Sequence, residues 1–107
     1  MRAVAMALPA ATWGVQWGGS DVYKVGGKVF AICGLRGGVS FKVSEIGFMA
    51  LIEGGPARQA PYLAKGHWVI VDLADLRAED CAAWLASSHA LVSAKLTRQV
   101  KRELGLN

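Results

Sequence analysis

The side chains with the most reactive chemistry in this sequence are two cysteines and two histidines. Cys33, His67, Cys81 and His89 lie far apart along the chain, and no two of them have the spacing of zinc ligands. The two cysteines fall in apolar segments, where free, buried thiols in a reducing compartment are the expected state. A cysteine nucleophile paired with either histidine stays open, although no neighbouring residue marks an activated thiol. We therefore expect neither a metal site nor a bound cofactor.

A lysine that follows two glycines, Gly26-Gly27-Lys28, has part of a phosphate-binding loop motif. The complete motif needs a glycine at position 22, a Ser or Thr after the lysine, and a helix beyond it. Val22 and Val29 stand at these two positions, and a strand pattern follows, so the sequence does not contain this motif.

The titratable groups assemble into no recognisable reaction class, so we expect a protein that is not an enzyme.

Basic residues are the feature that most favours a function. The chain has 12 Lys and Arg against 8 Asp and Glu, a formal net charge of +4, which suits a polyanionic partner. Six cations on or beside the predicted hairpins are candidates for contacts with DNA phosphates: Lys24, Lys28, Arg36, Lys42, Arg58 and Lys65. Three nearby side chains are candidates for base stacking or for lining a pocket: Tyr62, His67 and Trp68. A further basic run, from Lys95 to Arg102, is interpreted as a solvated helix end that complements the helix dipole.

The stretch from residue 21 to residue 43 must position most of these cations. Two apolar runs, 22–25 and 28–33, are separated only by Gly26-Gly27, and glycine tolerates the positive φ that tight hairpin turns require. A second turn at 34–38 leads to residues 39–43, where apolar and polar side chains alternate. The pattern predicts a three-stranded antiparallel meander.

The register of the first hairpin decides which side chains share a face. Pairing Val25 with Lys28 would place Tyr23 opposite Phe30 and Val22 opposite Ala31. The predicted helix-covered face is bulky and consists of Tyr23, Val25, Phe30 and Ile32. The other face is shallow, is expected to be solvated or to face a ligand, and consists of Val22, Lys24, Val29, Ala31 and Cys33.

The remaining segments complete a single domain over residues 1–107, long enough to bury about two-thirds of its unfolded surface. We expect a short N-terminal helix rather than a signal peptide, a strand at 12–17, a helix at 45–53 capped by Ser44, and an edge segment at 58–63. An interior strand is predicted at 67–73, followed by a helix over 76–104 kinked at Ser87-Ser88. The apolar runs are shorter than the ~20 residues of a membrane span, so we expect a cytoplasmic protein that does not use a membrane.

Three segments together resemble the MmcQ/YjbR family of small bacterial proteins. They are YKVGGKVFA at 23–31, APYLAK at 60–65 with Trp68-Val69, and the stretch from Trp84 through SSHALV at 87–92 to Leu96. The resemblance implies an α+β fold similar to that of frataxin, in which an antiparallel sheet of about five strands packs on helices in two layers. It also implies a DNA-binding role proposed for a double-wing motif, with no catalytic residues. Two departures are a shorter N-terminal helix and His89, where tyrosine is commoner.

These observations lead to two hypotheses for function. The first is a cytoplasmic, non-enzymatic DNA-binding module, whose contacts with phosphates would be weak and tolerant of sequence. The alternative is a small-molecule or protein-interaction module that uses the shallow sheet face around Lys24, His67 and Trp68.

Overall fold

The strands of the chain form a six-stranded antiparallel sheet in the computed structural model, which describes residues 1–16, 18–34 and 37–106. In spatial order these are β1 (Ala11–Gln16), β2 (Ser20–Val25), β3 (Lys28–Cys33), β4 (Gly38–Lys42), β6 (Trp68–Asp72) and β5 (Ala57–Gln59). The expected α+β class is confirmed, with one strand more than predicted. As expected, β6 is interior and the short β5 lies at an edge.

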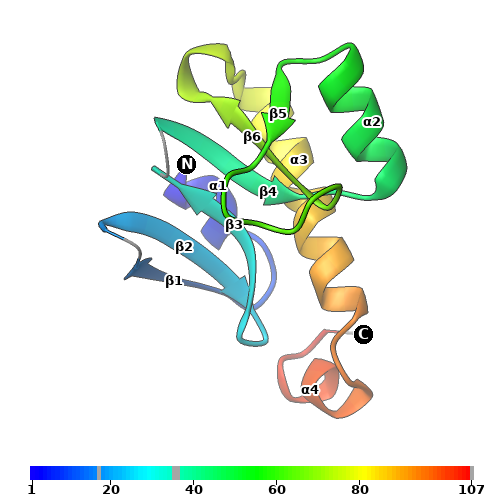
Figure 1. Ribbon diagram of the computed structural model, residues 1–107. Coiled ribbons are helices and arrows are strands. Elements are labelled where there is room, and N and C mark those ends of the chain that lie inside the picture. The colour runs from blue at the N-terminus through cyan, green and yellow to red at the C-terminus, as the bar shows by residue number, and fades with distance from the viewer. Residues whose placement is uncertain (17, 35–36, 107) are drawn as a thin grey trace.

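Four helices and the 3-10 turn η2 accompany the sheet in the described part of the chain. They are α1 (Arg2–Met6), α2 (Glu45–Glu53), η2 (Leu73–Asp75), α3 (Ala78–Ala94) and α4 (Arg98–Glu103). In Figure 1, α1 and α3 lie behind the sheet, and the segment that joins β5 to β6 crosses in front of it. The main core lies between the helices and the sheet and includes Phe30, Phe41 and Leu85, none more than 1% exposed. None of the described helices is long and apolar enough to cross a membrane.

The helix limits follow capping residues. Ser44 caps α2 as predicted, because its hydroxyl accepts a hydrogen bond from the Gly47 amide at 3.0 Å. The predicted kink at Ser87-Ser88 is wrong, since α3 runs unbroken through both serines. The break falls instead after Ala94, where Thr97 starts a new helix by accepting a hydrogen bond from the Val100 amide.

A β-bulge in β3 changes the predicted hairpin register. Val25 pairs with Lys28 and Lys24 with Val29 as expected, but the register then shifts. One extra residue on β3, the bulge residue Phe30, is accommodated at this point. The predicted pairs of Tyr23 with Phe30 and of Val22 with Ala31 are therefore wrong.

The bulge also changes which face each β3 side chain occupies. Tyr23 pairs with Ala31, and both pack in the helix-side core together with Phe30. Ile32, predicted on the helix side, lies on the opposite face beside Val22. That face is not shallow and solvated as predicted, because Val22 and Ile32 are at most 1% exposed. At the other end of this face, Ala60 and Leu63 of the β5–β6 connection pack against Trp68 and Ile70.

A buried serine on α3 takes the place of a ladder hydrogen bond where β3 and β4 separate. Their pairing ends at Ala31 and Phe41, although in an uninterrupted ladder Phe30 and Lys42 would be the next pair. The Ser88 hydroxyl lies between them, donating to the Phe30 carbonyl at 2.6 Å and accepting from the Lys42 amide at 2.8 Å. Ser88 is fully buried, so its hydroxyl supplies a partner to both backbone groups away from solvent.

Replacing Ser88 by alanine should lower the free energy of unfolding by about 2–4 kcal/mol, because two buried backbone groups lose their partner. Urea denaturation measures this change. The matched control is Ser87→Ala, an exposed neighbour on the same helix, which should stay within about 0.5 kcal/mol of wild type. Equal stability of the two variants would contradict the bridging role.

Candidate functional site

A pocket of about 300 Å³ lies where β3 and β4 separate. It is lined by Gly27, Lys28, Val29, Lys42, Trp68, Val92 and Lys95, and is called the lysine pocket below. Because the two strands do not pair beyond Ala31 and Phe41, the ends of both strands diverge. The α3 helix contributes Val92 and, at its C-terminal end, Lys95.

The hairpin turn carries Lys28 to the C-terminal end of α3. Gly26 and Gly27 both have positive φ, at 59° and 79°, as a type I′ turn requires. A Cβ on Gly26 would lie 2.7 Å from Leu96 Cδ1, so the glycine allows the turn to rest on this leucine. Since Leu96 directly follows Lys95, the contact places Lys28 and Lys95 at the same pocket.

The ammonium group of Lys42 is affected by its surroundings in this pocket. Partial burial is the main cause that lowers the pKa of Lys42, and the neighbouring charges of Lys95 and Lys28 lower it further. No Asp or Glu lines the pocket among the described residues. The lysine pocket is therefore a site of uncompensated positive charge, suited to a phosphate or carboxylate anion.

The floor of the lysine pocket is apolar. Trp68 is only 9% exposed and packs with Ala60 and Ile70, while Val29 and Val92 complete the lining. With so little of its ring accessible, Trp68 offers no stacking surface to solvent. It forms part of the apolar lining of the pocket instead.

Among the described residues, the remaining predicted site residues do not line the lysine pocket. Lys24 is the cross-strand partner of Val29, so it lies beside the pocket. Lys65, His67 and Tyr62 are exposed in the β5–β6 connection, with Tyr62 at 80%. Arg58, on the edge strand β5, forms an ion pair with Asp72 at 2.9 Å. Arg36 lies outside the described residues.

Lys95 is the pocket residue that the sequence analysis did not assign to a site. The basic run from Lys95 to Arg102 predicts a solvated helix end instead. Its place beside Lys28 and Lys42 follows from the packing of Gly26 on Leu96, and no local sequence pattern indicates such a contact.

The described residues offer no group of three or more His, Cys, Asp or Glu side chains that could hold a metal ion. Cys33 and Cys81 are both free, and burial is the main cause that raises the pKa of each thiol. Raised values disfavour the nucleophilic thiolate.

Comparison with known proteins identifies relatives of this chain. A family model described as YjbR matches residues 6–91. The crystal structure of Deinococcus radiodurans protein DR2400, which contains a DUF419 domain, superposes with a TM-score of 0.86 at 27% sequence identity. The alignment covers 99% of this chain and 86% of the Deinococcus chain. No curated protein matches the sequence.

Replacing Lys42 by methionine should raise the melting temperature near neutral pH. The folded-state pKa lies below the ordinary value of 10.5, so the charged lysine destabilises the folded protein at pH values below both. This penalty is relieved as pH rises through the lowered pKa towards 10.5, and the advantage of the variant should shrink over the same range. Calorimetric melting at several pH values measures the effect. Lys65→Met, at an exposed loop position outside the lysine pocket, is the control; a Lys42→Met advantage that does not change with pH would contradict the electrostatic explanation.

Proposed function

The chain belongs to the YjbR family, and we propose that it is a cytoplasmic, non-enzymatic DNA-binding module. The observation that carries this proposal is the lysine pocket, in which Lys28, Lys42 and Lys95 converge without a lining carboxylate among the described residues. Three ammonium groups around one depression suit a phosphate group of the DNA backbone.

Phosphate contact explains why the cations are carried on turns and strand ends. In this proposal the β2–β3 hairpin is one wing and brings Lys24 and Lys28 to the DNA, while the β5–β6 connection is the other and brings Lys65. Because the phosphate backbone is the same in every sequence, contacts of this kind give affinity with little base specificity.

Arg58, on the edge strand β5, is available for a secondary phosphate contact outside the two wings. Its ion pair with Asp72 joins side chains that are 55% and 44% exposed. Exposed ion pairs are worth little, so a phosphate can take the guanidinium from the carboxylate at small cost.

A small-molecule role for the lysine pocket is the second candidate. Its support is the volume of about 300 Å³ and the apolar floor that includes Trp68, which suit a compact anionic ligand. A metabolite would then raise the melting temperature while duplex DNA would not.

Replacing Lys28, Lys42 and Lys95 together by glutamine should weaken duplex binding and its salt dependence. If each lysine neutralises one phosphate, the slope of log K against log salt should fall in magnitude by about 3. Fluorescence anisotropy with a labelled duplex at several salt concentrations measures both quantities.

The matched control removes three charges from α4, through Arg98→Gln, Lys101→Gln and Arg102→Gln. This variant has the same net charge as the pocket variant, so it separates a local contact from general attraction. Equal losses in the two variants, or no duplex binding by the wild-type protein at low salt, would overturn the proposal.

A further inference from the structure

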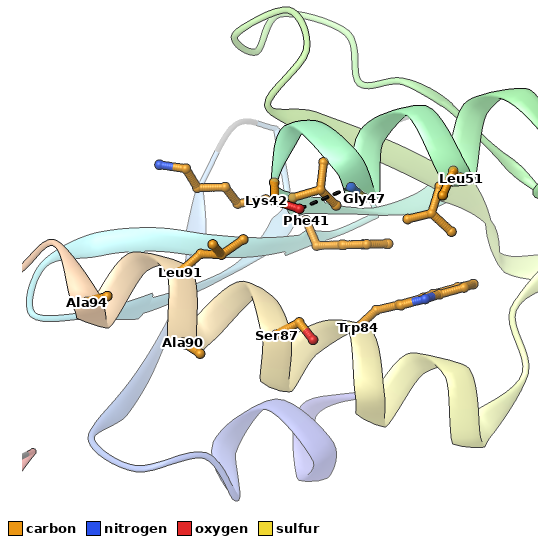
Figure 2. Close-up of a pocket in the computed structure, with 12 residues that line it drawn as sticks. Phe41, Lys42, Gly47, Leu51, Trp84, Ser87, Ala90, Leu91 and Ala94 are labelled. Atoms are coloured by element: carbon orange, nitrogen blue, oxygen red, sulfur yellow. Dashed lines mark hydrogen bonds between the residues drawn. The ribbon is translucent and has the colours of Figure 1, made fainter.

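An apolar groove with a volume of about 610 Å³ lies between α2, α3 and the end of β4 (Figure 2). The β4 end contributes Phe41, Lys42, Val43 and Ser44, α2 contributes Gly47, Ala50 and Leu51, and α3 contributes Trp84, Ser87, Ala90, Leu91 and Ala94. Its volume is that of a small-molecule binding site.

The groove stays open because small residues line it on both helices. Gly47 and Ala50 on α2, and Ser87, Ala90 and Ala94 on α3, carry side chains too short to fill the space. The larger α2 residues Phe48 and Ile52 instead pack against the main core.

The two ends of the groove differ in chemistry. Phe41 and Trp84 stack at one end, with ring centroids 5.4 Å apart and an interplanar angle of 14°. In Figure 2 the Lys42 side chain extends away from these rings. The hydroxyl of Ser44 already accepts a hydrogen bond from the Gly47 amide. Lys42 is the charged residue of the lining.

Lys42 also lines the lysine pocket, so the apolar groove and the cluster of three cations share this residue. A hydrocarbon compartment that ends at uncompensated positive charge is complementary to a molecule with an apolar tail and an anionic head. A neutral ligand would leave the mutual repulsion of the lysines unrelieved, whereas an anionic head would offset it.

We propose that the groove between α2 and α3 binds a long-chain carboxylate amphiphile, with its tail against Phe41 and Trp84 and its carboxylate on Lys42. This site is separate from the proposed DNA contacts except for the shared Lys42. The apolar lining excludes water from the tail, and the ammonium group fixes the direction in which the molecule lies.

Isothermal titration calorimetry with oleate and with oleyl alcohol, below micelle-forming concentrations, tests this proposal. Oleate should bind with one molecule per chain and at least about tenfold more tightly than the alcohol, because only the acid forms a charge-assisted contact. Lys42→Met should bring the two affinities together by weakening oleate alone.

A groove-filling variant tests the location. Ala50→Phe should weaken both ligands at least about tenfold by occupying the space for the tail, while Ala86→Phe, at an exposed alanine of α3 outside the groove, should leave both unchanged. Unaltered oleate affinity in Ala50→Phe, or equal binding of acid and alcohol to wild type, would overturn the proposal. Saturable binding of an amphipathic helical peptide without any oleate binding would also overturn it.

Duplex binding by Ala50→Phe keeps this proposal separate from the proposed function. The substituted side chain is outside the lysine pocket, so DNA affinity should stay at the wild-type value. Loss of oleate binding with unchanged DNA binding supports two sites on one chain.

Discussion

The hydroxyl of Ser88 determines how the two layers of this protein are joined. It bonds to the Phe30 carbonyl and the Lys42 amide, two groups that an unbroken sheet would pair with each other. A side chain from α3 thus stands inside the sheet ladder, and β3 and β4 are held apart beyond that point. The lysine pocket occupies the resulting gap. The buried hydroxyl needs hydrogen-bond partners, and backbone groups of the two strands provide them.

The α3 helix links the separate parts of the molecule. Leu85 and Val92 pack in the main core, next to Ser88 in the helix. The imidazole Nε2 of His89 is 2.7 Å from the Pro9 carbonyl oxygen, which ties the N-terminal segment to the same helix. Lys95, the C-cap of α3, lines the lysine pocket, and Trp84, in the N-terminal half of the helix, lines the groove. A displacement of this helix would therefore disturb the core, the lysine pocket and the groove together.

Lys42 is the residue at which the two proposed sites meet. It ends β4, its amide is fixed by Ser88, and its side chain lines both the lysine pocket and the apolar groove. Partial burial near two other lysines lowers its pKa, so an anion of either kind would relieve an unfavourable charge arrangement already present in the fold. Phosphate on the outer side and carboxylate on the groove side are alternative ways to supply that anion.

The sequence alone determined the features that depend on local chemistry. The Gly26-Gly27 turn, the Ser44 cap and the alternation in β4 were predictable because each rests on the preferences of a few neighbouring residues. Even the pairing of Lys24 with Val29 followed from the turn. Only the tertiary structure decided the bulge at Phe30 and the place of Lys95, since both depend on where α3 packs. A strand pattern cannot show that a serine from a distant helix will replace a ladder bond, and a basic helix end does not reveal which turn will rest beside it.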